Sequence, residues 1–413
     1  MARRFGRWIK DLCSYLLVDS ESHWAIVSGA VCPSQAVRWE AYSKGGVLKR
    51  TLYMGMLDKL LGRGPEPLLG IDISSSAIKL LELRRAGSRY EVCAFAIEGL
   101  PPAAVVDKQI NEPESVGEAI AKAVQRAGTK TKRAAVAVAG SSVITKTITM
   151  PASLSEADME EQIKVEADQY IPYSIDDVNL DFQILGPTEN TDETVDVLLA
   201  ACRKDTVESR ISVLELGGLK PAIVDIEAFV LENACEVLKP QMPDQGRGRT
   251  VAVVDVGSSG TSTIILQDGE VVHTRDQQFG GRQLTEDIMR HYGMSWEEAG
   301  KAKRFGNLPE DYHDSVLAPF VEDMAQQIDR GLQFYFASSG EAQRIDQILL
   351  AGGCAGIPGV DTTISERLDI PTAIAQPFAD MTVMSRAKPQ LVERDATSML
   401  LACGLALRAF DTP

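Results

Sequence analysis

The sequence predicts an α/β protein with more than one domain. Apolar runs of strand length, such as residues 251–256, alternate with segments of helical periodicity along most of the chain. At roughly 100–200 residues per domain, the 413 residues leave room for two or three domains. A composition of 45% hydrophobic and 24% charged residues is typical of a soluble globular protein.

The first 53 residues do not share this pattern. They contain three of the four tryptophans and carry eight Lys or Arg against four Asp or Glu, whereas the whole chain has a net charge of -16. Basic residues ahead of the apolar run 12–18 faintly resemble a signal peptide, but the run is short and no clear cleavage site follows. We therefore expect a poorly packed extension and favour a gene start placed too far upstream, with translation beginning at Met54 or Met56.

The ordered pattern begins near Leu68 with a hairpin and a helix. Residues 68–73 and 78–83 read as two strands joined by three serines, and further strands are expected at 90–97 and 134–138. Pro113–Ala127 predicts a helix, because its apolar residues recur on one face and a glycine follows as a stop.

A second helix is predicted over residues 153–171. Ser153 would cap it, and Glu156 three residues later would complete a capping box. Apolar residues recur at helical spacing from Met159 to Tyr170, and Pro172 ends the pattern.

The second half of the chain repeats the alternation of strands and helices. Its predicted elements are a strand at 195–202, a helix at 206–215, a strand at 222–226, a Pro- and Gly-rich linker at 241–248, a strand at 251–256, a hairpin of 264–267 with 270–275 around an Asp-Gly turn, helices within 283–340 with a long one from Pro319, a strand at Gln347–Ala351 and a last helix at 396–409.

Charge and cysteine usage argue against several classes of function. A net charge of -16 repels phosphate backbones, so nucleic-acid binding is disfavoured. No apolar run approaches the ~18 residues of a membrane-spanning helix, so direct membrane insertion is not expected. The seven cysteines include no C-x-x-C pair and the four histidines form no cluster, which indicates buried free thiols in a reducing cytosol and not a metal site.

The most informative feature is an internal near-repeat that superposes Asp72 on Asp255. In each copy an apolar strand ends in Asp, a tight turn of Gly and Ser follows, and a second strand begins. Either copy alone is typical of an ordinary hairpin turn. Two copies in matching strand contexts, with Gly352 and Gly353 after a third apolar strand, favour a nucleotide site instead.

The chemistry of such a site follows from its residue types. Small residues let backbone N–H groups crowd around phosphate oxygens, and Ser or Thr hydroxyls add donors. Asp72 and Asp255 would hold Mg²⁺, through water, because Mg²⁺ keeps much of its hydration shell. Lys79 would offset phosphate charge, while Gly352 and Gly353 suit a loop against which an adenine base lies. Neither a Walker A loop nor a G-x-G-x-x-G motif is present.

Two phosphate hairpins and a glycine-rich adenosine loop resemble the actin, hexokinase and DnaK superfamily. Segments 68–83, 166–185 and 279–288 are similar to the type IV pilus assembly protein PilM family, with FtsA as the nearest relative in architecture. The resemblance covers about residues 54–413. Ser74 stands where glycine is usual in the superfamily, so the resemblance implies at most a slow ATPase.

The resemblance implies an actin-like fold of two lobes around a nucleotide cleft. The first lobe is expected at residues 66–142 and 219–245, with residues 385–413 returning to it. A small α/β subdomain, residues 143–218, would be inserted in the first lobe and bind a partner. The second lobe is expected at residues 249–384.

The resemblance also assigns site residues, position by position. Asp72 and Asp255 would organise Mg²⁺, and Glu227 would position the attacking water, although stabilising the following helix with its charge is the rival interpretation. Lys303 would lie near the phosphates or be a solvated residue of a charged helix. The remaining ATP contacts implied are Ser74, Ser75, Ser76, Lys79, Gly257, Ser258, Ser259, Thr261, Gly281, Gly352 and Gly353.

The function implied is that of a cytoplasmic ATP-binding adaptor of the type IV pilus platform and of twitching motility. It would be held at the inner membrane by the cytoplasmic N-terminal tail of a PilN-like protein, bound between the first lobe and the inserted subdomain, and it would contact other pilus assembly proteins. Tyr170, Ile171 and Tyr173 are groove candidates, with core packing as the alternative. An FtsA-like membrane-associated filament protein and a metabolite kinase are the other functions considered.

Overall fold

The structure is a computed structural model that describes residues 17–18, 24–25, 66–167, 169–188, 191–339 and 344–411. The predictions for residues 1–53 therefore lie outside the described residues, apart from the short antiparallel strands β1 (Leu17–Val18) and β2 (Trp24–Ala25).

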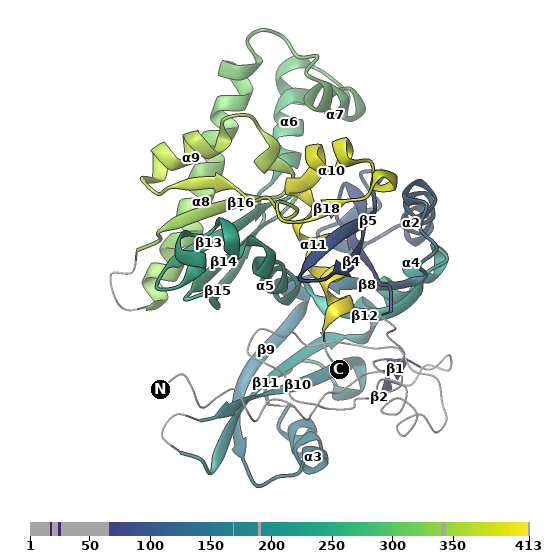
Figure 1. The fold of residues 1–413 in the computed structure, drawn as a ribbon, viewed down its shortest axis with the longest axis vertical. Helices are drawn as coiled ribbons and strands as arrows, with labels where there is room; N and C mark the ends of the chain where they lie inside the picture. The colour runs from purple at the N-terminus through teal and green to yellow at the C-terminus, as the bar shows by residue number, and fades with distance from the viewer. Residues whose placement is uncertain are drawn as a thin grey trace.

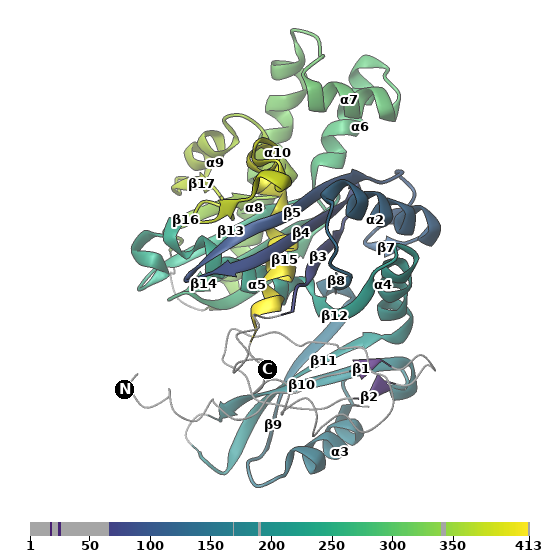
Figure 2. The same ribbon diagram turned by 45° about the vertical axis from the view of Figure 1, so that its right-hand side comes forward.

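Two β-sheets lie at the centres of two lobes (Figures 1 and 2). The first lobe has a six-stranded sheet in the order β12-β8-β3-β4-β5-β18, and the second a five-stranded sheet in the order β15-β14-β13-β16-β17. The strands of the first sheet are β3 (Leu69–Ile73), β4 (Ala77–Ala86), β5 (Arg89–Gly99), β8 (Arg133–Val138), β12 (Lys220–Ile226) and β18 (Thr382–Val383). Those of the second are β13 (Thr250–Val256), β14 (Thr261–Gln267), β15 (Glu270–Gln277), β16 (Gln347–Ala351) and β17 (Thr372–Ile374).

The near-repeat of the sequence is also a repeat of topology. β3 pairs antiparallel with β4 and parallel with β8. In the same way, β13 pairs antiparallel with β14 and parallel with β16. Every residue of β3 is buried, as expected of a strand covered on both faces.

Two helices lie between the sheets and join the lobes (Figure 1). Apolar residues of α5 (Glu227–Leu238) share one core with β13, β14 and Leu400, the first residue of α11 (Leu400–Leu407). A side chain at Gly404 would place its Cβ 2.1 Å from the carbonyl oxygen of Val230, so only glycine lets α11 pack this closely on α5.

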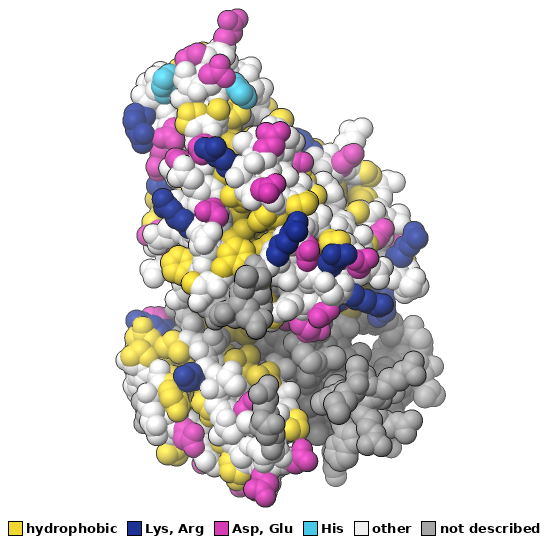
Figure 3. All heavy atoms as spheres, turned by 90° about the vertical axis from the view of Figure 1, so that its left-hand side faces the viewer, with side chains coloured by type: hydrophobic (Ala, Val, Ile, Leu, Met, Phe, Trp, Pro, Cys, Tyr) yellow, Lys and Arg dark blue, Asp and Glu magenta, His cyan; other side chains and the backbone are white. Residues whose placement is uncertain are grey.

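Helices α2 (Pro113–Ala127) and α4 (Lys204–Leu216) cover the outer face of the first-lobe sheet, and α8 (Ala318–Ser339) and α9 (Val360–Leu368) cover that of the second. In the second lobe, α6 (Gly281–Tyr292) and α7 (Trp296–Phe305) lie beyond the sheet, at the top of Figure 1. Helix α10 (Pro389–Asp395) lies beside β5. On the face drawn in Figure 3, Lys or Arg and Asp or Glu side chains are interspersed over the described residues and do not gather into a basic patch.

A three-stranded antiparallel sheet in the order β10-β11-β9 extends from the first lobe, at the bottom of Figure 1. Its strands are β9 (Val143–Pro151), β10 (Val178–Pro187) and β11 (Thr194–Arg203). The helix α3 (Glu156–Ala167) packs its apolar residues, including Met159 and Ile163, on one face of this sheet.

Helix α4 differs from the sequence-based expectation. It lies within the range 143–218 expected for the inserted subdomain, yet it packs in the first lobe. Its residues Val207, Val213 and Leu214 belong to one core with Ile120 of α2 and Val136 of β8. The helix buries its apolar face there because the first-lobe sheet and α2 already offer a matching surface.

Two other boundaries were predicted wrongly. The helix predicted from Ser153 begins at Glu156 and ends at Ala167. Its cap is Ser155, whose Oγ accepts a hydrogen bond from the N–H of Asp158 at 3.3 Å. The chain also rejoins the first lobe before residue 385, because Thr382 of β18 already pairs with β5.

Asp181 of β10 is a titratable residue of the inserted sheet whose protonation should affect the stability of the protein. It lies opposite Ala200, which belongs to the first-lobe core, so its face of the sheet is the one turned to that lobe. Burial raises the pKa of Asp181 to about 7. Since the pKa of Asp181 is raised in the folded state, the contribution of this residue to folding stability is greatest at low pH, below the unfolded pKa of about 4. That contribution is lost as the pH rises through about 7.

We expect Asp181→Asn to stabilise the protein at pH 8, by on the order of 1–3 kcal/mol, and by a smaller amount at pH 5, where the folded state is still protonated. Asparagine keeps the acceptor that the Phe182 N–H uses at 2.8 Å. Urea unfolding at both pH values measures the effect, with the exposed Asp177→Asn as control. An equal effect at the two pH values would show that Asp181 does not titrate in this range.

Candidate functional site

The turns that follow the two predicted aspartates meet across the lobes. The first serine turn (residues 74–76) joins β3 to β4, and the second serine turn (residues 257–260) joins β13 to β14. The hydroxyl of Ser259 donates a hydrogen bond to the hydroxyl of Ser75, with 3.0 Å between the oxygens. The structure therefore brings together the two halves of the near-repeat.

Within the described residues, several backbone N–H groups of these turns donate no hydrogen bond. Among the hydrogen bonds within the described residues, none uses the N–H of Ser75, Ser76, Ser258 or Ser259 as donor. These residues are half-buried or exposed. Neighbouring free N–H groups in a turn of small residues suit an anion, and phosphate oxygens in particular.

Two predicted phosphate contacts already use their hydroxyls within the fold. The Ser74 Oγ donates to the carbonyl of Ala77 at 2.8 Å and so closes the first serine turn. Thr261 is buried, and its Oγ1 donates to the carbonyl of Phe279 at 2.8 Å. Both therefore shape the site from within, and the prediction that Thr261 offers its hydroxyl to a ligand does not fit this geometry.

Asp72 and Asp255 lie near one ammonium group. The Nζ of Lys79 is 2.8 Å from Oδ2 of Asp72, so Lys79 neutralises this carboxylate. Burial lowers the pKa of Lys79, but the charges of Asp72 and Asp255 outweigh this and raise it. Burial raises the pKa of Asp255 to about 6, although Lys79 opposes the shift. The two aspartates thus share one electrostatic environment.

A second ion pair lies in the same cluster and was not predicted from the sequence. Lys108 pairs through its Nζ with Oε2 of Glu227 at the start of α5. Glu227 is the acidic residue in the first turn of α5, where its negative charge favours the helix, as the rival interpretation expects. Water positioning, helix stabilisation and this ion pair are therefore all compatible with its position.

Lys108 comes from the small hairpin β6 (Val105–Val106) and β7 (Gln109–Ile110). Its two-residue turn, Asp107 and Lys108, has positive φ at both positions, 49° and 64°. Such turns usually carry Asn-Gly or Asp-Gly. The Asp107-Lys108 pair therefore gave little indication of a hairpin turn in the sequence. Nothing in the local sequence pattern links Lys108 to Glu227.

The glycines of the second lobe gather at the end of β13. At Gly352, where φ is +87°, a Cβ would lie 2.2 Å from the carbonyl oxygen of Val256 and 2.6 Å from Oδ1 of Asp255. Gly353 has no atom within 4 Å of its Cβ position. The N–H of Gly281 donates to the carbonyl of Gly257 at 3.0 Å, so α6 begins against the second serine turn.

Lys303 lies on a charged helix and is exposed as a residue, but its ammonium group is hydrogen-bonded to α6. Its Nζ donates to the carbonyl of Gly281 at 2.8 Å and to Oγ1 of Thr285 at 2.6 Å. Burial lowers the pKa of Lys303. The side chain therefore fixes the first turn of α6 beside the second serine turn.

The donor set fits a magnesium ion bound through water better than one in a protein cage. No group of three or more His, Cys, Asp or Glu side chains that could hold a metal occurs in the part of the chain that the structure describes. Asp72 and Asp255 are the carboxylates at the strand ends, and Mg²⁺ normally takes one or two carboxylates together with phosphate and water.

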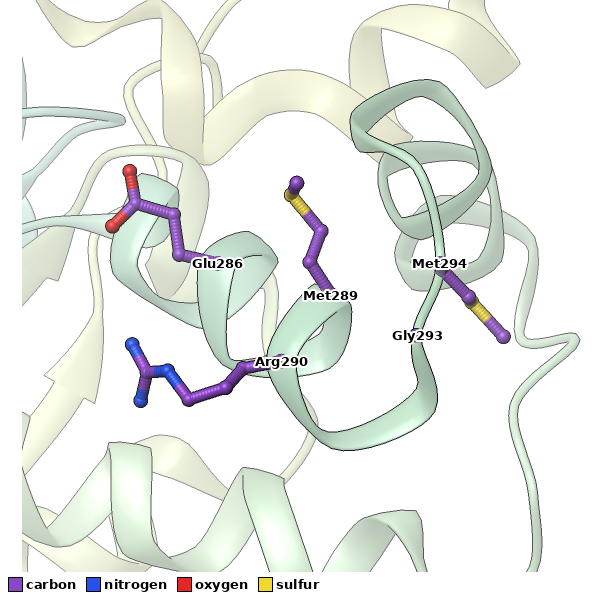
Figure 4. A pocket seen from close by; sticks show the side chains of 5 residues that line it. All are labelled: Glu286, Met289, Arg290, Gly293 and Met294. Atoms are coloured by element: carbon purple, nitrogen blue, oxygen red, sulfur yellow. The ribbon is translucent and has the colours of Figure 1, made fainter.

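A hollow of about 430 Å³ lies on another part of the second lobe (Figure 4). It is lined by the second half of α6 and the loop after it: Glu286, Met289, Arg290, Gly293 and Met294. It includes none of the residues predicted for the nucleotide. Among the described residues, every helix is too short or too polar to span a lipid bilayer.

Among curated proteins, the chain is 24% identical over 357 residues to the cell division protein FtsA of Bacillus subtilis (strain 168), covering 76% of this chain and 79% of that protein. It is 30% identical over 157 residues to the ethanolamine utilization protein EutJ of Salmonella typhimurium (strain LT2), covering 38% of this chain and 48% of that protein. The chain thus spans about half the length of this EutJ relative.

Among solved structures, a chain of a PilM-PilN type IV pilus biogenesis complex is similar with a TM-score of 0.70 and 25% identity, covering 84% of this chain and 99% of that chain. EutJ from Carboxydothermus hydrogenoformans is similar in fold, with a TM-score of 0.51 and 15% identity over 88% of this chain and 99% of that chain. These likenesses confirm the predicted actin-like fold. The family model of the type IV pilus assembly protein PilM matches residues 70–410, most of the chain, and the chain therefore belongs to that family.

Proposed function

We propose that this chain binds ATP with magnesium between its lobes and acts as an adaptor of the type IV pilus assembly platform. The observation that carries the proposal is the contact of the two serine turns, Ser75 to Ser259 at 3.0 Å, with free N–H groups on both sides. A triphosphate held by both turns would tie the lobes together, so nucleotide would bias their closure.

Each residue of the cleft has a role in this proposal. The N–H groups of Ser75, Ser76, Ser258 and Ser259 bind phosphate oxygens, while Asp72 and Asp255 hold the waters of a magnesium ion. Magnesium, when bound, offsets phosphate charge. Gly353 leaves open space for the base beside Gly352. Glu227 orients a water, and its pairing with Lys108 is consistent with slow or absent hydrolysis.

The proposed partner is the cytoplasmic N-terminal tail of a PilN-like inner-membrane protein, which would hold this chain at the membrane from the cytoplasm. The solved complex similar to this chain is one of PilM with PilN. Tyr170 and Tyr173 are 40% and 46% exposed and are therefore available to a peptide. Ile171 is buried in the core of the inserted subdomain, which favours the packing interpretation for this residue.

The test is equilibrium binding of ATP and of a synthetic PilN-like tail peptide to the full chain, each measured with and without the other. Coupling must be reciprocal, so ATP should change the affinity for the peptide by the same factor as the peptide changes the affinity for ATP. If neither ligand changes the affinity for the other, nucleotide gating is contradicted. If no ATP binds at millimolar concentration, the nucleotide site itself is contradicted.

The similarity to FtsA supports a second candidate, a filament-forming protein associated with membrane. Sedimentation with bare anionic liposomes in the presence of ATP separates the two proposals. We expect the chain to stay in the supernatant unless the tail peptide is anchored on the liposome. Sedimentation without the peptide would favour the second candidate.

A further inference from the structure

Lys108 reaches from the first lobe to the second serine turn. A Cβ added to Gly260 would lie 3.6 Å from the Cε of Lys108, so the methylene stem of the lysine rests against that turn. The ammonium group at its end pairs with Glu227. Lys108 thus lies at the point where both lobes and the start of α5 come together.

The backbone of Lys108 is held in place, whereas its side chain keeps some freedom. The buried guanidinium of Arg210 donates to the carbonyl of Lys108 at 2.6 Å, and the turn fixes φ at 64°. The side chain is still 31% exposed. An ammonium group at the end of a long, partly exposed side chain on a fixed backbone can change partners without a change of fold.

The charges of the cluster make one exchange favourable. Lys79 is already paired with Asp72 at 2.8 Å, and Lys303 donates to Gly281 and Thr285 within the second lobe. Among these ammonium groups of the described residues, Lys108 is the one that approaches the second serine turn from the first lobe. A terminal phosphate carries more negative charge than the carboxylate of Glu227 and offers more acceptor oxygens. A triphosphate in the cleft therefore competes with Glu227 for Lys108.

We propose that Lys108 is the residue by which this chain distinguishes a nucleoside triphosphate from a diphosphate. Its ammonium group leaves Glu227 for the terminal phosphate, and the Glu227 carboxylate becomes free to orient a water. A diphosphate lacks that phosphate, so Lys108 stays on Glu227. The inference rests on the proposed nucleotide site and assigns its specificity.

The experiment measures dissociation constants of ATP and ADP for the full chain, by displacement of a fluorescent nucleotide, in the wild type and in Lys108→Met. A hydrogen bond between charged groups contributes about 1.5–3 kcal/mol, so we expect ATP affinity to fall roughly 10- to 100-fold and ADP affinity to change less than about threefold. Lys108→Arg keeps the charge and should retain most of the preference for ATP.

The matched control is Lys122→Met, an exposed lysine of α2 paired with Glu118, which should leave both affinities unchanged. Glu227→Gln should change the ATP affinity in the opposite direction, because it removes the carboxylate that competes with the terminal phosphate for Lys108. We expect this variant to bind ATP about three- to tenfold more tightly and ADP as the wild type does.

Three outcomes would overturn the inference. Equal losses for ATP and ADP in Lys108→Met would make Lys108 a general contact, and unchanged affinities would remove it from the site. Unchanged or weaker ATP binding by Glu227→Gln would show that the two partners do not compete. If the wild type binds neither nucleotide, the proposed function itself fails, which is a different result from a loss confined to the variant.

Discussion

Replacing Gly352 with alanine is expected to destabilise the second lobe by about 3 kcal/mol or more and to abolish ATP binding. The added Cβ would lie 2.2 Å from the carbonyl oxygen of Val256, and the backbone is held at φ +87°, where alanine is strained. The loop cannot move away freely, because the N–H of Gly352 donates to the carbonyl of Thr397 at 2.8 Å.

The neighbouring glycine is a matched control with a different expected result. Gly353 has open space at its Cβ position and no positive φ. Gly353→Ala should therefore keep the melting temperature of the wild type without nucleotide. If the base lies against this loop, the same variant should bind ATP roughly tenfold more weakly.

Thermal unfolding without nucleotide and calorimetric titration with ATP separate the two effects. Equal stability of Gly352→Ala and the wild type would contradict the close packing at Val256. Wild-type ATP affinity in Gly353→Ala would place the base elsewhere in the cleft.

Replacing Arg408 with methionine is expected to cost about 3–5 kcal/mol of stability, because it leaves a buried carboxylate without its partner. The Nε of Arg408 is 2.6 Å from Oδ2 of Asp225, and both side chains are almost fully buried. Arg408 follows α11 and Asp225 lies in β12, so the pair fastens the end of the chain to the first-lobe sheet.

Burial raises the pKa of Asp225, and the charge of Arg408 opposes that shift. Without Arg408 the pKa of Asp225 rises further, so the variant should lose more stability at pH 8 than at pH 5. The double variant Arg408→Met with Asp225→Leu should recover a large part of the loss, since the fully buried carboxylate of Asp225 is removed together with its partner. Asp411, which also pairs with Arg408, is 16% exposed and keeps some access to water.

Urea unfolding of the single and double variants measures these differences. Arg394→Ala serves as control, because Arg394 pairs with Asp395 at an exposed site, where an ion pair contributes about 0–1 kcal/mol. A loss of less than about 1 kcal/mol in Arg408→Met would show that Asp225 finds another partner or water.

Local sequence patterns were sufficient to predict most of the helices and strands that the structure describes. Pro113–Ala127 and Gln347–Ala351 have the predicted bounds, because apolar period and flanking glycine agree in each. The strands β9 and β10 were not predicted. Residues such as Thr145, Lys146 and Thr147 make β9 look polar, and it becomes a strand by pairing with β11.

The residues of the candidate site likewise fall into two groups, those that a local sequence pattern indicates and those that it does not. The serine turns and Gly352 carry a signal in the sequence, because two Asp-ended strands with turns of small residues recur in matching contexts and a glycine pair follows a third strand. Lys108 and Arg210 carry no such signal. They lie 102 residues apart, and the hydrogen bond between them exists only because α4 packs in the first lobe.

By itself, the sequence determined the alternation of strands and helices and the two Asp-ended strands with their small turns, because periodicity and turn chemistry act over a few residues. Only the tertiary structure decided that Ser75 meets Ser259, that Lys79 neutralises Asp72, and that Lys108 pairs with Glu227. Those contacts join residues from different elements, and the packing of two sheets around α5 and α11 brings them together.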